Sequence, residues 1–193
     1  MSTLSAFAKL GILLVVPFAV LIAGGIFMTL LADPRNVFDR RYRFLPRATE
    51  PKPLNRRYGY NKDDVKEVWG YPKRKPALDV QRRLLEYDLL FPIVYGAALA
   101  LCLWVAWSIL GGPFAVGWLF VPVVIAMLAD WTENLVQLEQ LARYSGKCAQ
   151  GLDARSIQIA SFATRTKLTF FGVSWAFLLA LVLGFVWRYF RAG

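Results

Sequence analysis

Two carboxylates and two amides stand at helical spacing directly after one of the most apolar runs of the chain. Asp130, Glu133, Asn134 and Gln137 recur at intervals of three and four residues, so a helix places them on one face. Carboxylates three residues apart can share a metal ion, or divide acid and base roles if their surroundings separate their pKa values. An unpaired charge in or beside a bilayer costs roughly 3 kcal/mol or more, so this stripe requires partners.

The composition indicates the class of protein and excludes several kinds of site. The 193 residues are 57% hydrophobic, with a mean hydropathy of +0.43, which is too apolar for an ordinary soluble domain. Histidine is absent, which excludes most zinc sites and the triads and haem sites that depend on histidine. We therefore expect one all-α membrane domain over 1–193, a polytopic integral membrane protein with no catalytic residue, metal ion or cofactor.

Four apolar segments are long enough to cross a hydrocarbon layer of about 30 Å. They cover about 4–31, 89–110, 114–136 and 168–187. A cleaved signal peptide is the alternative for the first segment, but its apolar core is longer than such peptides usually have. Gly24-Gly25 would let another helix approach that segment closely. Pro92 and Pro122 are expected to kink the helices in which they stand.

A strongly basic segment, 33–87, separates the first two spans. It holds fifteen Lys and Arg residues between 33 and 83. Its first half has several prolines and no apolar period, which predicts an extended arm without a core of its own. Aromatic side chains alternate there with arginines, which beside a membrane favours anionic headgroups or a partner protein over nucleic acid. The arm residues expected to bind are Arg40, Arg41, Tyr42, Arg43, Phe44, Arg56 and Arg57.

The second half of this segment carries clearer helix signals. Asn61 can cap a short helix over Lys62–Trp69. Its apolar side, which we expect to pack on other cytosolic segments rather than on the membrane, holds Val65, Val68 and Trp69. A further helix is expected to begin at Pro76 and to run without a break into the span at 89–110.

Basic residues are distributed unevenly between the two sides of this topology. The two loops on one side hold twenty Lys and Arg residues, and the termini on the other side hold three. Positively charged loops are retained in the cytoplasm. With four spans, the two basic loops are therefore expected in the cytoplasm and both termini outside.

The topology brings polar groups of three helices to one depth. The candidate site comprises Asp88, Asp130, Glu133, Asn134, Ser161, Thr164 and Lys167. Lys167 or Arg165 is expected to neutralise part of the acidic charge, and Arg82 or Arg83 the rest. The hydroxyls of Ser161 and Thr164 are expected to donate hydrogen bonds to the remaining carboxylate oxygens. The cluster is either a site for a lipid headgroup, a cation or a reacting ester, or a clamp between helices, which needs fewer assumptions.

An ordered set of residues carries a resemblance to a known group of proteins. The set is Tyr60, Asp63-Asp64-Val65, Arg82, Asp88-Leu89-Leu90-Phe91-Pro92, Tyr95-Gly96, Asp130-x-x-Glu133-Asn134, Ala160-Ser161, Thr164 and Lys167. It resembles small bacterial four-span integral membrane proteins, and the Asp-x-x-Glu-Asn element is its most distinctive part. The resemblance implies a bacterial inner-membrane protein, and hence periplasmic termini. It implies no catalytic role for any residue, and it does not extend to the arm at 33–57.

Three functions from different classes remain open. The first is a non-enzymatic module that binds a partner protein or anionic lipid, as an accessory subunit of a larger membrane complex. The second is a lipid-processing enzyme that uses Asp130 and Glu133. The third is a subunit of an oligomeric carrier or channel, which should show polar positions through the whole bilayer. We favour the first, because an arm without a core gains order by lying on something else.

Overall fold

The computed structural model describes residues 11, 15–16, 19–20, 22–24, 26, 54, 57–70, 77–110, 112 and 114–192. Its elements follow one another as α2 (Lys62–Gly70), α3 (Ala77–Asp88), α4 (Phe91–Ile109), α5 (Gly117–Lys147), the 3-10 helix η4 (Cys148–Gly151) and α6 (Ala154–Ala192). The part of the chain that the structure describes is helical and contains no strand, so the predicted all-α class is confirmed there.

Three helices of the described residues are long and apolar enough to cross a membrane. They are Gln81–Ile109, which runs from the end of α3 across a two-residue turn into α4, and the single helices Gly117–Tyr144 and Ala154–Arg191. They contain most of the predicted spans at 89–110, 114–136 and 168–187. Most of the first predicted span, 4–31, lies outside the described residues, although those described between 11 and 26 are helical. The fourth span therefore stays a prediction.

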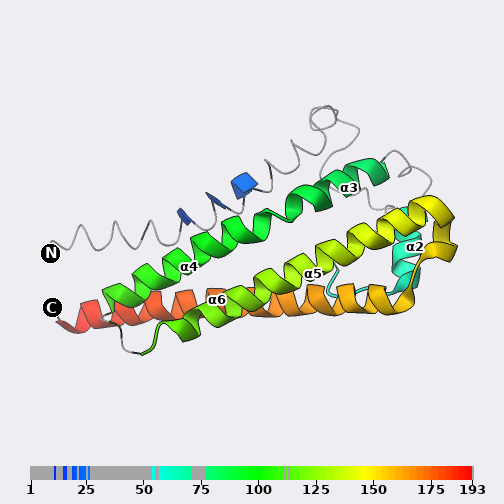
Figure 1. The fold of residues 1–193 in the computed structure, drawn as a ribbon. Coiled ribbons are helices and arrows are strands. Elements are labelled where there is room, and N and C mark those ends of the chain that lie inside the picture. The colour runs from blue at the N-terminus through cyan, green and yellow to red at the C-terminus, as the bar shows by residue number, and fades with distance from the viewer. Residues whose placement is uncertain are drawn as a thin grey trace.

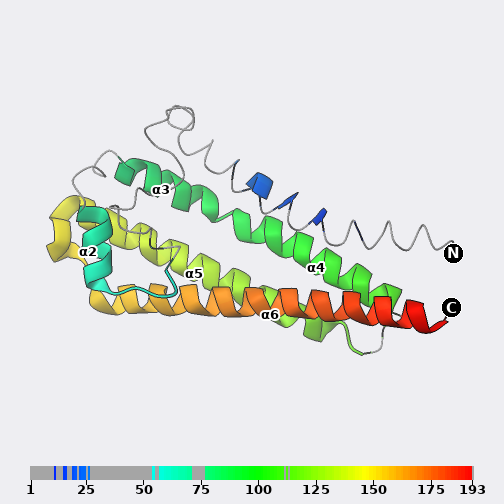
Figure 2. The same cartoon turned by 180° about the vertical axis from the view of Figure 1, so that it is seen from behind.

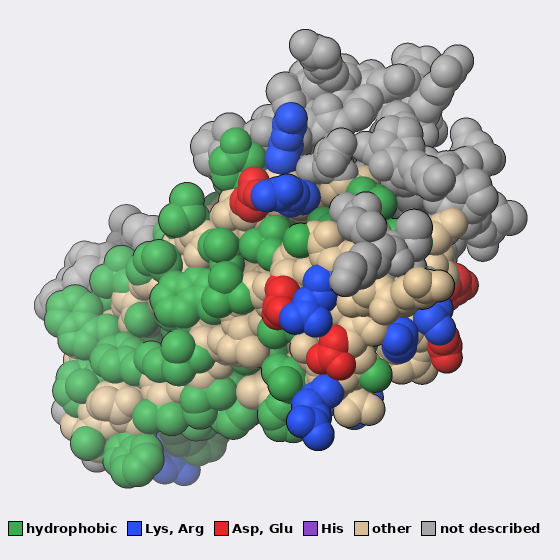
Figure 3. All heavy atoms as spheres, turned by 45° about the vertical axis from the view of Figure 1, so that its right-hand side comes forward, with side chains coloured by type: hydrophobic (Ala, Val, Ile, Leu, Met, Phe, Trp, Pro, Cys, Tyr) green, Lys and Arg blue, Asp and Glu red, His purple; other side chains and the backbone are tan. Residues whose placement is uncertain are grey.

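The long helices form a bundle in which α4, α5 and α6 run in alternating directions (Figure 1). With 31 and 39 residues, α5 and α6 are the longest, and α2 lies across their ends where they connect (Figure 2). Figure 3 shows a broad hydrophobic area over one end of a face of the molecule, with most charged side chains gathered toward the other end. This division is typical of a bundle with one end in an apolar medium and the other in water.

The expected unbroken run from α3 into α4 is wrong. The first helix ends at Asp88, Leu89 and Leu90 form a turn, and α4 begins at Phe91. Pro92 stands in the first turn of α4, where a missing N–H group is tolerated, so it starts this helix rather than kinking it. Pro122 stands inside α5, as expected.

The span region has its own hydrophobic core. It consists of Leu99, Cys102, Leu103, Ala106, Leu119, Val123, Leu178 and Leu181, from α4, α5 and α6. Cys102 is a free, buried thiol. The described residues of the first segment reach this bundle at Gly24, which lies so close to Phe91 that a Cβ atom would collide with the ring. A small residue thus permits the close helix approach that the sequence predicts.

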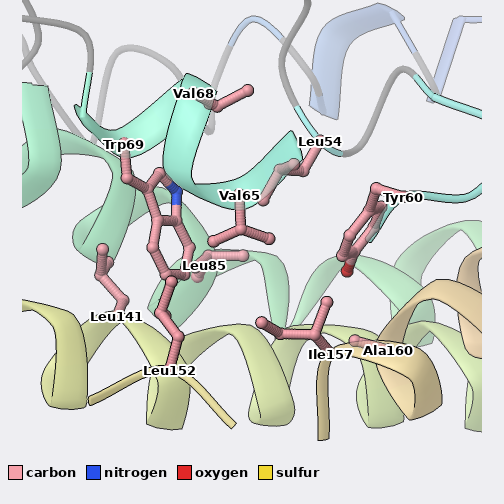
Figure 4. Close-up of a cluster of buried hydrophobic side chains, with 10 residues drawn as sticks. All are labelled: Leu54, Tyr60, Val65, Val68, Trp69, Leu85, Leu141, Leu152, Ile157 and Ala160. Carbon is pink, nitrogen blue, oxygen red and sulfur yellow. The ribbon is translucent and has the colours of Figure 1, made fainter. Parts of the chain in front are cut away.

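A second core lies at the α2 end, where the sequence predicts an arm without one. It consists of Leu54, Tyr60, Val65, Val68, Trp69, Leu85, Leu141, Leu152, Ile157 and Ala160. Trp69 points from α2 toward Leu141 and Leu152, and Val65 points toward Leu85 (Figure 4). The expected packing of α2 is therefore confirmed. The sequence did not predict that Leu54, in the arm, joins this core, which the segment 54–70 completes with α5 and α6.

Local hydrogen bonds explain where α2 and α6 begin. The side-chain oxygen of Asn61 accepts hydrogen bonds from the N–H groups of Asp63 (2.8 Å) and Asp64 (3.0 Å), while the Asp64 carboxylate accepts one from the Asn61 N–H (2.7 Å). This reciprocal pairing is a capping box. At the start of α6 the Asp153 carboxylate accepts hydrogen bonds from the Ser156 hydroxyl and N–H, which lower the pKa of Asp153.

Candidate functional site

A layer of buried and part-buried polar side chains lies between the two cores. We call it the polar layer, and it consists of Tyr60, Asp88, Tyr95, Asp130, Glu133, Asn134, Gln137 and Lys167. On α5, Asp130 is 4% exposed and Glu133 is fully buried. Buried charges of this kind persist only when they are paired and hydrogen-bonded. The contacts of these two carboxylates therefore decide what the layer can do.

Lys167 on α6 pairs with both carboxylates of α5. Its Nζ atom lies 3.0 Å from an oxygen of Asp130 and 2.5 Å from an oxygen of Glu133. The predicted neutralisation by Lys167 is thus confirmed. The alternative cation, Arg165, is exposed on the same helix and forms no ion pair with either acid. One ammonium group therefore joins the two longest helices through a hydrogen bond to Asp130 and an ion pair with each carboxylate.

Amide and phenol groups satisfy the remaining carboxylate oxygens. Gln137 donates to Glu133 (3.0 Å) and to the hydroxyl of Tyr60 (2.9 Å). The Tyr95 hydroxyl donates to Asp130 (3.1 Å). Burial raises the pKa of the Tyr60 phenol above its ordinary value, and Glu133 raises it further, so Tyr60 keeps its proton in the folded protein.

The turn between α3 and α4 docks on α5 through its carbonyl groups. Pro92 has no N–H group to donate to the Asp88 carbonyl, and the Asn134 amide donates to that carbonyl (3.4 Å) and to the Asp88 carboxylate (3.1 Å). The Ile93 N–H donates to Leu90 rather than to Leu89. The freed Leu89 carbonyl accepts a hydrogen bond from the Trp131 indole at 2.7 Å.

This docking gives a first prediction. Trp131→Phe keeps the aromatic ring but removes the indole N–H, which leaves a part-buried carbonyl without its donor. We expect the free energy of unfolding to fall by about 1–3 kcal/mol, measured by reversible unfolding in detergent micelles. Trp104→Phe is the matched control, because Trp104 is 51% exposed on α4, and it should change stability by less than about 0.5 kcal/mol. Equal effects of the two substitutions would contradict a role for the indole hydrogen bond.

The other predicted contacts of the cluster are wrong. Arg82 pairs with Glu86 on its own helix at 2.9 Å, and Arg83 is exposed. The Ser161 hydroxyl accepts a hydrogen bond from the backbone N–H of Tyr60 at 2.8 Å. The Thr164 hydroxyl donates to the Ala160 carbonyl of its own helix at 3.0 Å. Ser161 therefore holds the segment before α2 against α6 instead of serving a carboxylate.

Most of the predicted binding arm lies outside the described residues. Those residues are Arg40, Arg41, Tyr42, Arg43, Phe44 and Arg56. Arg57 is described, and it forms ion pairs with Asp64 and with Glu67 (3.1 Å) on α2. This arginine helps to fix α2 in place, and its predicted role in binding remains a prediction.

The polar layer differs from a typical metal or catalytic centre. Within the described residues, no group of three or more acidic, Cys or His side chains could hold a metal ion. The carboxylates face an ammonium group, amides and phenols of the same chain. The predicted site did not include Trp131, Tyr95 or Tyr60, although all three form hydrogen bonds at or beside the polar layer. Pro92 is the signal that points to Trp131 and Asn134, because proline leaves a carbonyl of the preceding turn without a donor.

Comparisons with protein-family models, with curated proteins and with solved structures found no match to this chain.

Proposed function

We propose that this chain is a non-enzymatic helical module of the bacterial inner membrane that presents a basic arm to a partner protein or to anionic lipid. The supporting observation is the polar layer, in which Lys167 pairs with both Asp130 and Glu133. A general acid or base must reach a substrate, whereas these groups reach one another. The layer acts as a clamp between helices.

The folded segment at the α2 end supports the same proposal. Leu54 is 1% exposed and lies in the second core, so the chain is held in place directly after the arm. The predicted arm at 33–57 thus ends in this core. Fifteen basic residues between 33 and 83 favour an anionic surface as its counterpart.

Site-specific crosslinking in cells tests this function. A photoreactive residue replaces Tyr42 or Phe44 in the full chain, and crosslinked protein or lipid is identified by mass spectrometry. We expect adducts that disappear when Arg40, Arg41 and Arg43 are changed to Gln. Changing Arg188 and Arg191 to Gln is the control, because it removes charge from the opposite terminus. Absence of any arm-dependent adduct would refute the proposal.

A second experiment addresses enzymatic function directly. Asp130→Asn and Glu133→Gln are introduced separately, and the cellular lipids are compared with those of the parent strain. We expect no change in lipid composition beyond the change in protein abundance. A lipid that accumulates in both variants at normal abundance would favour lipid processing instead.

A further inference from the structure

The chain before α2 follows one face of α6 toward the apolar span. The backbone N–H of Tyr60 donates to Ser161, and the hydroxyl of Tyr58 lies 3.4 Å from the hydroxyl of Thr169. Between these contacts, Gly59 lies against Arg165. Three successive residues thus match positions spaced by four along α6, and Tyr58 lies closest to the apolar span.

The backbone conformation at Gly59, beside Arg165, favours glycine. Gly59 has a φ of 101°, which other residues rarely adopt, and a Cβ atom there would collide with the guanidinium group. The absence of a side chain at Gly59 therefore leaves room for the guanidinium beside the Tyr58–Tyr60 backbone. Arg165 is nevertheless exposed, and no acidic side chain of the described residues forms an ion pair with it.

Distances along α6 give the depth of this arginine. Thr169 and Trp187 are eighteen residues apart, a helical rise of about 27 Å, which is close to the thickness of a hydrocarbon core. Trp187 is 62% exposed and Tyr58 is 67% exposed, as is typical of aromatic residues at the two interfaces. Arg165 is four residues further from the span than Thr169, about 6 Å, which is the depth of the headgroups.

We propose that Arg165 and Tyr58 bind the phosphate of an anionic phospholipid in the leaflet on the α2 side. The guanidinium donates N–H groups to the phosphate oxygens, and the phenol donates its O–H. The acyl chains lie against the apolar face of α6 that begins at Leu168, which is 41% exposed. This inference deepens the proposed function, on which it rests, by assigning a lipid class and a site outside the arm.

Titration of lipid into the purified full chain tests the site. Native mass spectrometry from a mild detergent counts the bound molecules of phosphatidylglycerol, with phosphatidylcholine as the neutral lipid. We expect Arg165→Gln to weaken binding of the first phosphatidylglycerol about fivefold. Tyr58→Phe, which keeps the ring, should weaken it about twofold to fivefold. Each substitution should weaken the binding of phosphatidylcholine less than it weakens the binding of phosphatidylglycerol.

Arg155→Gln is the matched control. Arg155 is also exposed on α6, but it stands ten residues, about 15 Å, further from the span than Arg165. This position lies in the water beyond the headgroups. The substitution should change binding less than twofold. Equal effects of the two arginine substitutions would overturn the proposal, because they would indicate that the anionic lipid is attracted to any basic side chain and not to this site. Competition by inorganic phosphate at millimolar concentration would also overturn it in favour of a free-anion site.

The lipid test and the test of the proposed function can fail separately. The titration uses purified protein and variants outside the arm, whereas the crosslinking experiment reports on Tyr42 and Phe44. Absence of any arm-dependent adduct, with weaker lipid binding in Arg165→Gln, would leave the lipid site standing without the proposed function. Unchanged lipid binding in Arg165→Gln with intact arm adducts would remove the lipid site alone.

Discussion

Replacing Lys167 with Met is expected to lower the free energy of unfolding by about 3–5 kcal/mol. The substitution keeps an unbranched side chain of similar length but removes the ammonium group. Asp130 and Glu133 would then remain buried side by side with no cation at 3.0 Å and 2.5 Å. Reversible unfolding in detergent micelles, followed by circular dichroism, measures the loss.

Two further variants show whether the loss comes from unpaired charge. Adding Asp130→Asn and Glu133→Gln to Lys167→Met removes the negative charges as well, and should restore part of the lost stability. Lys66→Met is the control, because Lys66 is 43% exposed in its pair with Asp63, and it should cost less than about 0.5 kcal/mol. A Lys167→Met protein as stable as the parent would show that the acids do not depend on this ammonium.

Replacing Trp69 with Ala is expected to lower the free energy of unfolding by about 3–5 kcal/mol. Trp69 is 1% exposed, and its ring meets Tyr144 edge to face with the ring centroids 5.6 Å apart. The cavity would release α2 from α5 and α6. Trypsin should then cleave the segment at Lys62 and Lys66 faster than in the parent protein, which limited proteolysis can follow.

The control separates core packing from contact with the membrane. Trp118→Ala removes a tryptophan that is 71% exposed at the start of α5, and should change stability by less than about 1 kcal/mol. If α2 instead rested on lipid, Trp69→Ala would keep the stability of the parent and would weaken only the binding of the protein to vesicles. That result would contradict the second core.

Features that depend on near neighbours could be predicted from the sequence. The cap at Asn61 and the buried side of α2 both follow from residues within one or two turns. The pairing of Lys167 with the acids followed from placing three helices at one depth, since few cations stand near that depth. The ion pair of Arg82 with Glu86 was missed although it is a local pair four residues apart.

Contacts between distant segments explain the remaining errors. Ser161 was assigned to a carboxylate because nothing local indicates that the N–H of Tyr60 would reach it. The place of Leu54 in the second core was missed because Leu54 has too few apolar neighbours in sequence to form a core alone. The partners of Leu54 on α5 and α6 become its neighbours only when the bundle assembles. A sequence pattern shows only the periodicity within one segment.

The hydrogen bond between Tyr60 and Ser161 can form only after the ribosome has synthesised both residues. The two residues are 101 positions apart, so synthesis of the second follows the first by roughly 5–20 s at ordinary rates of translation. During that interval α2 has no α6 to rest on, and the apolar side of Trp69 is available to chaperones and proteases. Completion of the last helix is therefore what protects the water-facing segment, and a chain interrupted before α6 should be degraded from this segment.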